Sequence, residues 1–249
     1  MSPSSQSRYC FVIPIYNHYP SVWDIIRKVQ KTGIPLILVD DGSTDEMAGV
    51  DIENDHRLAG VTFLRHTGNR GKGAALLTGL TAAAQFSRWA ITADADGQHS
   101  PADYPSLLQA VSPGTRPIVV GSRLGMDNKT IPWTSRHGRK FSNFWVRLAG
   151  GPKISDTQSG FRLYPLPETL DLAAHARRFQ FEVEILVKAR WSGMPVVEAP
   201  VSVHYQPGAA RVSHFRPVVD FMRNTAVFSR LIFQRILFHP ATRRRRGGP

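Results

Sequence analysis

The sequence predicts an α/β fold built on an open, mostly parallel sheet with helices on both faces. Three observations lead to this prediction. Short, nearly continuous apolar runs alternate with helical patterns, which is typical of strands buried on both faces of a parallel sheet. Three of these runs in succession end in polar, turn-forming segments. The 249 residues also suffice for one large α/β domain or two small ones.

The predicted elements follow one another along the chain. A first strand is followed by a helical pattern from Ser21, a candidate N-cap, through Lys31. Strand, helix and strand then form a βαβ unit, and a second helix is predicted at residues 74–86. The predicted strands are at residues 9–13, 35–39, 61–65 and 89–93.

Composition restricts the function classes. The net charge of +12, from 31 Lys and Arg against 19 Asp and Glu, indicates an anionic partner such as a nucleotide sugar, a lipid phosphate, a membrane surface or a nucleic acid. The one cysteine, Cys10, excludes an intramolecular disulfide. Residues 1–8 lack the apolar stretch of a signal peptide, and no run of about 18 residues is free of charge. We therefore expect a cytoplasmic protein.

The most informative motif begins where the fourth predicted strand ends. Asp94 and Asp96 follow this strand, and Gln98 stands two positions further on. In an open α/β sheet, ligands bind beyond the carboxyl ends of the strands. Two carboxylates and an amide oxygen suit a divalent cation that takes its other ligands from water and substrate phosphates. The competing interpretation is an Asx turn that caps the next helix.

Several segments, taken together, resemble family 2 glycosyltransferases, most closely the dolichyl-phosphate mannose synthase branch and its bacterial polyprenyl-phosphate relatives. The segments are residues 13–17, 39–45, 69–73, 94–99, 121–123, 156–162 and 181–186. The resemblance covers residues 9–215 and implies a Rossmann-like GT-A fold. It also implies a nucleotide-diphosphate sugar donor, UDP- or GDP-linked, and Mg²⁺ or Mn²⁺ as the cofactor.

The resemblance also implies donor-site roles for individual residues. Pro14, Tyr16 and Asp41 would flank the nucleotide, with Asp41 accepting a base N–H. Asp94, Asp96 and Gln98 match the metal and diphosphate positions, and Lys72 could add a positive charge. Arg211 and Ser213 are candidates for donor-phosphate contacts. The alternatives are a plain turn at residues 40–43 and a solvated lysine at the start of a helix.

For the acceptor, the resemblance implies arginines that bind a lipid phosphate. Arg123 is one candidate, and Arg136 and Arg139 are the candidates for the second; a solvated basic helix face is the alternative. A hydroxyl acceptor would need a carboxylate base, whereas an anionic phosphate would not. Asp156 is the first candidate base and Glu184 the second. If residues 181–189 are helical, one of the glutamates 182 and 184 should face the site and the other solvent.

The ends of the chain receive separate predictions. Residues 1–8 should be flexible, residues 9–215 catalytic, residues 216–239 an amphipathic helical segment and residues 240–249 a basic disordered tail. A basic amphipathic helix next to a polybasic tail favours binding to an anionic membrane surface without spanning it. A terminal helix packed on the core is the alternative.

The leading hypothesis is a metal-dependent, inverting hexosyltransferase at the inner face of the cytoplasmic membrane. Its acceptor would be lipid-linked, either a polyprenyl phosphate or an acyl or polyene chain. A glycosyltransferase acting on a soluble or glycan hydroxyl is the alternative. A nucleotidyltransferase lacks its glycine-rich loop at the first strand, and a nucleic-acid-binding module would leave three acidic strand ends unexplained. Nucleic acid is therefore not an expected partner.

Overall fold

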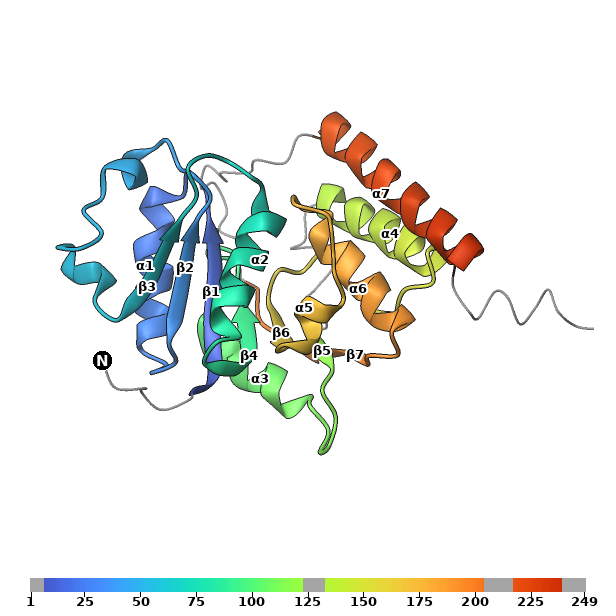
Figure 1. Ribbon diagram of the computed structural model, residues 1–249, viewed down its shortest axis with the longest axis horizontal. Coiled ribbons are helices and arrows are strands. Elements are labelled where there is room, and N and C mark those ends of the chain that lie inside the picture. The colour runs from blue at the N-terminus through green and yellow to red at the C-terminus, as the bar shows by residue number, and fades with distance from the viewer. Residues whose placement is uncertain (1–6, 123–132, 204–216, 239–249) are drawn as a thin grey trace, which may run out of the picture.

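The computed structural model describes residues 7–122, 133–203 and 217–238, without the side chains of 133–138, 217–224 and 238. It contains a seven-stranded sheet of order β3-β2-β1-β4-β6-β5-β7 (Figure 1). β6 runs antiparallel to both of its neighbours, and every other pairing is parallel. The predicted open, mostly parallel sheet is therefore confirmed. The strands are β1 (Ser7–Ile15), β2 (Leu36–Asp40), β3 (Val61–Arg65), β4 (Ser87–Thr92), β5 (Ile118–Ser122), β6 (Arg162–Pro165) and β7 (Val196–Pro200).

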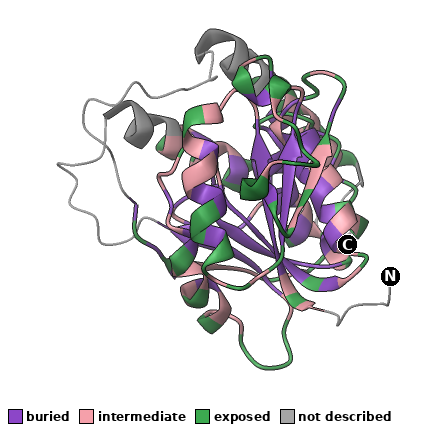
Figure 2. Ribbon diagram, turned by 90° about the vertical axis from the view of Figure 1, so that its left-hand side faces the viewer, coloured by how far each residue is buried: buried purple, intermediate pink, exposed green. Residues whose placement is uncertain are grey.

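Helices cover both faces of this sheet, and Figure 2 shows the strands buried between them. One face packs against α1 and α3, and the other against α2 and α6. The α-helices are α1 (Tyr19–Gln30), α2 (Lys72–Ala83), α3 (Tyr104–Gln109), α4 (Trp133–Leu148), α5 (Glu168–Asp171), α6 (Phe181–Trp191) and α7 (Pro217–Phe238). The short 3₁₀ helices are η1 (Glu46–Gly49), η2 (His56–Leu58) and η3 (Pro101–Asp103).

The alternation of side chains along β1 explains why the sheet has two apolar faces. Phe11 and Ile13 join the core on the α1 side, whereas Cys10 and Val12 join the core on the α2 side. Burial raises the pKa of the Cys10 thiol to about 12. The thiol is thus a packed, unreactive side chain.

The first helix differs from its prediction at its start. α1 begins at Tyr19, two residues before the candidate N-cap Ser21, because Pro20 fits the first turn of a helix. The Ser21 hydroxyl instead donates to the His18 carbonyl oxygen (3.2 Å). Asp45 ties this helix start to the next loop by accepting from the Tyr19 N–H (3.0 Å) and the Met47 N–H (3.1 Å).

A further helical layer lies outside α6. α4 and α7 lie side by side and both contact α6 (Figure 1). Their shared core consists of Val146, Ala149, Val183, Val187, Phe228 and Leu231. The helix predicted within residues 216–239 is therefore present as α7, and it packs on α4 and α6 through Phe228 and Leu231. Among the described residues, none of the helices has the length and apolarity to cross a membrane.

The close approach of α2 to β1 gives a test of this packing. A Cβ at Gly79 would lie 2.3 Å from Val12 Cγ1, so Gly79→Ala would force the helix away from the strand. We expect a loss of ~1–3 kcal/mol in the free energy of unfolding, measured by urea denaturation. Gly49→Ala is the matched control, because a Cβ there meets open space. Equal stability of the two variants would contradict the packing described.

Candidate active site

The loops after β1 and β2 meet at one edge of the sheet. Asn17, in the loop after β1, donates its N–H to Ser43 Oγ (2.9 Å), and its Oδ1 accepts from the Thr44 N–H (2.7 Å). Pro14 is buried within β1, and Tyr16 is half-buried just after the strand. The predicted nucleotide-flanking residues of the first two strands therefore share this edge.

Asp41 braces the next loop from the same edge. Its side chain is buried and accepts from His66 Nδ1 (2.7 Å) and from the N–H groups of Arg70 (3.0 Å) and Gly71 (2.7 Å). The carboxylate therefore fixes the loop that leads into α2. Its contact with a nucleotide base stays a prediction.

Lys72, the first residue of α2, lies between two acids. Its Nζ is 2.6 Å from Asp94 Oδ1 and 2.8 Å from Glu182 Oε1. The lysine side chain is only 16% exposed, so the alternative of a solvated lysine is wrong. Burial alone would lower the pKa of Lys72, but the charges of Asp94 and Glu182 outweigh it and raise that pKa. In turn, Lys72 outweighs the effect of burial on Asp94 and lowers its pKa.

Asp96 and Gln98 lie at the open side of this cluster. Asp96 is exposed, and its carboxylate accepts from the Gln98 N–H (3.1 Å) and from Gln98 Nε2 (2.7 Å). The Asx turn of the competing interpretation is thus present, but the Asp96 side chain does not cap η3. Desolvation of the carboxyl group, and then the charge of Asp94, raise the pKa of Asp96 although the residue as a whole is exposed.

These residues can be tested for their fit to a divalent cation. Across the described ranges, His, Cys, Asp and Glu form no group of three or more that could hold a metal ion. A cation at Asp94 and Asp96 would therefore depend on the Gln98 oxygen, water and substrate phosphates for its other ligands. Mg²⁺ and Mn²⁺ accept such an oxygen-rich, substrate-completed set, so the residues fit the predicted cofactor.

The loop at residues 155–160 joins this cluster to the predicted acceptor residues. A Cβ at Gly160 would lie 2.5 Å from both carboxylate oxygens of Asp94, so only glycine allows this approach. At the other end of the loop, Asp156 is fully buried and its Oδ2 lies 3.9 Å from Arg139 Nη1 of α4. Asn143 of α4 holds the loop by accepting from the Thr157 hydroxyl (2.7 Å). Asp94 and Arg139 therefore lie at opposite ends of one short segment that contains Asp156.

The two glutamates of α6 correct one prediction. Both Glu182 and Glu184 are buried, so neither faces solvent. Glu184 accepts from Arg230 Nη2 of α7 (2.8 Å) and from the Ala176 N–H (2.6 Å), because α7 and the segment before α6 cover that side of the helix. These contacts hold the fold and disfavour the predicted role of Glu184 as a general base.

Four predicted residues lie wholly or partly outside the described residues. Arg123, Arg211 and Ser213 fall in segments that are not described. Arg136 lies in α4, but its side chain is not described. Their roles stay predictions.

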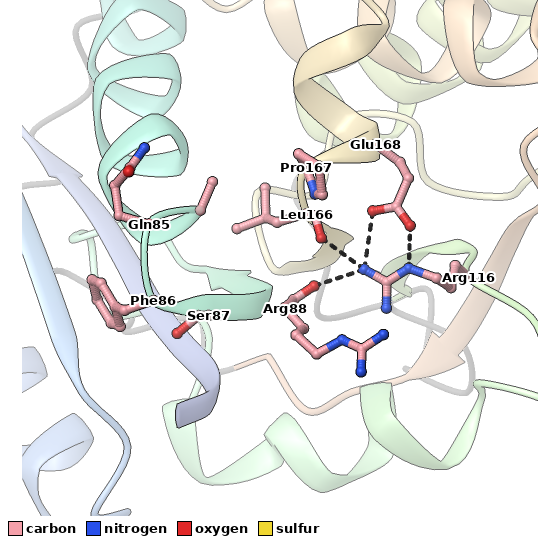
Figure 3. A pocket seen from close by; sticks show the side chains of 9 residues that line it. Gln85, Phe86, Ser87, Arg88, Arg116, Leu166, Pro167 and Glu168 are labelled. Atoms are coloured by element: carbon pink, nitrogen blue, oxygen red, sulfur yellow. Dashed lines mark hydrogen bonds and ion pairs between the residues drawn. The ribbon is translucent and has the colours of Figure 1, made fainter. Parts of the chain in front are cut away.

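A cavity of about 290 Å³ lies at the opposite end of β4 (Figure 3). Arg116 lies in its wall and forms an ion pair with Glu168, and its Nη2 also donates to the carbonyl oxygens of Arg88 and Leu166 (both 2.9 Å). Because Ser87 begins β4 and Asp94 follows its end, this cavity is separate from the acidic cluster.

Comparison with known families decides the identity of this site. The family model for glycosyl transferase family 2 matches residues 10–166, which is more than half of the chain and includes Asp41, Lys72, Asp94 and Asp96. The chain belongs to glycosyl transferase family 2. The predicted glycosyltransferase is thereby confirmed.

Curated relatives of this family 2 glycosyltransferase cover most of its length. The UDP-N-acetylglucosamine–dolichyl-phosphate N-acetylglucosaminyltransferase of Methanococcus voltae is 29% identical, over 78% of this chain and 84% of the relative. The polyprenol monophosphomannose synthase of Mycolicibacterium smegmatis is also 29% identical, over 78% of this chain and 77% of the relative. The predicted likeness to polyprenyl-phosphate glycosyltransferases is confirmed.

A solved structure supports the predicted GT-A fold. The mannosyltransferase PcManGT from Pyrobaculum calidifontis, in complex with GDP-Man and Mn²⁺, matches with a TM-score of 0.51 and 16% identity. The match covers 84% of this chain and 60% of that chain.

Arg162 of this glycosyltransferase is fully buried and was not among the predicted site residues. Its Nε donates to the Ser159 carbonyl oxygen (2.6 Å), Nη1 to that of Glu182 (2.7 Å) and Nη2 to that of Thr157 (2.9 Å). It thus ties the loop at residues 155–160 to α6. An arginine directly between Phe161 and Leu163 was the available signal, since a charge in an apolar run needs buried partners.

Replacing this arginine should destabilise the protein. Arg162→Met would leave three buried carbonyl groups without their donor, so we expect a loss of ~3–5 kcal/mol in the free energy of unfolding. Urea denaturation followed by circular dichroism measures the loss. Arg190→Met is the control on exposed α6 surface and should change stability by less than ~0.5 kcal/mol. A similar small change for both variants would contradict the role given to Arg162.

Proposed function

We propose that this glycosyltransferase transfers a hexose from a UDP- or GDP-linked sugar to a polyprenyl phosphate, with inversion and with a divalent cation. One observation carries the proposal: the loop at residues 155–160 touches Asp94 at one end and reaches Arg139 of α4 at the other. A donor diphosphate at Asp94 and Asp96 would therefore lie close to a cationic acceptor side.

The donor half of the proposal rests on charge. Lys72 contacts Asp94 at 2.6 Å, so its positive charge would lie beside a diphosphate bound at Asp94 and Asp96. When bound, a divalent cation at Asp94, Asp96 and Gln98 would neutralise charge on the departing nucleoside diphosphate. The M. voltae relative is named for a UDP-linked sugar, and PcManGT was solved with GDP-Man and Mn²⁺. Both nucleotides are therefore candidates here.

The part of the proposal that concerns the acceptor rests on the burial of Asp156. Its carboxylate is fully buried beside Arg139, which is a poor position for taking a proton from a hydroxyl acceptor. A phosphate acceptor needs no such base, because its oxygen is already anionic. Arg139, with Arg123 and Arg136 as further candidates, would hold that phosphate through forked hydrogen bonds.

The reaction would be a single displacement. An oxygen of the lipid phosphate attacks the anomeric carbon from the face opposite the diphosphate, and the bond from that carbon to the donor oxygen breaks. The electron pair of the broken bond stays on the nucleoside diphosphate, and no proton needs to be removed. Transfer to an acyl, polyene, soluble or glycan hydroxyl is the second candidate, and it would require Asp156 to become accessible.

Exposed apolar side chains on α4 and α7 support binding to an anionic membrane surface. Five of the seven exposed large apolar residues in the described ranges lie on α4 and α7. They are Phe144, Leu148, Phe233, Ile236 and Leu237. Such a concentration of apolar side chains on a protein surface marks an interaction site. The proposal assigns it to the inner face of the cytoplasmic membrane, where a lipid phosphate would be reached.

Neutralising Asp96 tests the proposed reaction. With polyprenyl phosphate, Mn²⁺ and a set of UDP- and GDP-linked hexoses, we expect release of nucleoside diphosphate from at least one donor. Asp96→Asn should lower kcat at least ~100-fold, because charge on the leaving group would be less well neutralised. Asp24→Asn, at a half-exposed aspartate on α1, should retain full turnover. A variant at position 96 within about threefold of the wild type would contradict the proposal.

Sedimentation with lipid vesicles tests the membrane surface. Phe233 is 61% exposed on α7, and Phe233→Glu replaces an apolar contact with a negative charge. We expect ~10-fold weaker binding to vesicles containing anionic lipid. Ile52→Glu, an equivalent change at an exposed apolar residue outside α4 and α7, should leave binding unchanged. Equal effects of the two changes would contradict a membrane surface on α7.

A further inference from the structure

Glu182 lies close to the acidic cluster without being one of the predicted cation ligands. Its Oε1 is 2.8 Å from Lys72 Nζ, which also contacts Asp94 Oδ1 at 2.6 Å. The glutamate side chain is only 8% exposed. Among the described residues, Lys72 is its one ion-pair partner. The lysine is therefore shared between Asp94, an acid of the candidate metal site, and Glu182, an acid outside that site.

The backbone around this shared lysine is tightly held. The Ala74 N–H donates to the Arg177 carbonyl oxygen (2.8 Å), and a Cβ at Gly73 would lie 2.6 Å from Phe181 Cβ. The start of α2 is thus locked against the start of α6 (Figure 1). Arg162 Nη1 also fixes the Glu182 carbonyl oxygen at 2.7 Å. These contacts fix the backbone positions from which the Lys72 and Glu182 side chains meet.

The charge of Glu182 affects how strongly the cluster would attract a divalent cation. Asp94, Asp96 and Glu182 carry three negative charges, and Lys72 is the cation that forms ion pairs with two of these acids. The buried guanidinium of Arg162 also acts electrostatically on Asp94 and on Glu182. Without the charge of Glu182, Asp94 would be the one acid paired with Lys72, and the lysine would neutralise it more completely. The attraction for a cation at Asp94 and Asp96 would then fall, because Coulomb interactions are strong in a partly desolvated site.

We propose that Glu182 is a positioning residue of the donor site. By pairing with Lys72, it reduces the extent to which the lysine neutralises Asp94, so that Asp94 keeps negative charge for binding a divalent cation. This inference rests on the proposed function, which puts the cation at Asp94 and Asp96. Glu182 itself does not contact the cation. Its contribution acts through Lys72 and through the net charge of the cluster.

Mn²⁺ binding to the purified full-length protein, followed by the electron paramagnetic resonance signal of free Mn²⁺, tests the inference. Glu182→Gln keeps the shape and an oxygen that accepts from Lys72, but it removes the charge. We expect at least ~10-fold weaker Mn²⁺ binding in this variant. Adding Lys72→Met to Glu182→Gln removes one positive and one negative charge and so restores the net charge of the wild-type cluster, and the double variant should therefore bind Mn²⁺ about as tightly as the wild type. A purely structural role of Glu182 would not be rescued in this way.

Two comparisons keep the test decisive. Glu168→Gln removes the charge of a glutamate that pairs with Arg116 beside the cavity of Figure 3, so it should leave Mn²⁺ binding unchanged. If Glu182→Gln does not fold, Lys72→Met alone should bind Mn²⁺ at least ~10-fold more tightly than the wild type, because Asp94 loses its neutralising partner; equal affinity would overturn the inference.

The outcomes separate the inference from the proposed function. Wild-type affinity in Glu182→Gln, or weakened binding that Lys72→Met does not restore, would overturn the inference alone. A wild-type protein that binds no Mn²⁺ would overturn the proposed metal dependence and the inference with it.

Discussion

The structure depends on one buried lysine held between two acids. Lys72 begins α2, Asp94 follows β4, and Glu182 lies in the first turn of α6, so this ion-pair cluster joins three elements that are distant in the sequence. A buried lysine is stable only with such partners, because the loss of hydration must be offset. The same cluster also sets the charge at the carboxyl end of β4, where the predicted metal-binding acids lie. Stability and the candidate chemistry are therefore built from the same residues.

The second constraint is the short loop before β6. Gly160 allows this loop to touch the Asp94 carboxylate. Arg162 donates to two carbonyl oxygens of the loop, and Asn143 fixes the loop to α4. The loop therefore fixes the position of the donor side relative to α4. This helix also bears Arg139 and part of the exposed apolar surface. In the proposed reaction, this arrangement brings a membrane-held phosphate to a soluble nucleotide sugar.

The sequence was sufficient for the features that depend on local pattern. Apolar strands that end in acidic turns predicted the parallel sheet and the edge where Asp41 and Asp94 lie, and the ordered motifs predicted the family. It was insufficient where partners are distant. Lys72 and Glu182 are 110 positions apart, so no pattern could show that they pair. The burial of both α6 glutamates likewise depends on α2 and α7 packing against one helix, which helical periodicity alone does not contain.

The most direct test of the account is a crystal structure with Mn²⁺ and a nucleoside diphosphate, in which the metal is located by its anomalous scattering. The account predicts an anomalous peak within coordination distance of the Asp96 carboxylate and of a diphosphate oxygen, with Lys72 still in contact with Glu182. A bound nucleotide whose diphosphate lies away from Asp94 and Asp96, with no anomalous peak beside them, would contradict it.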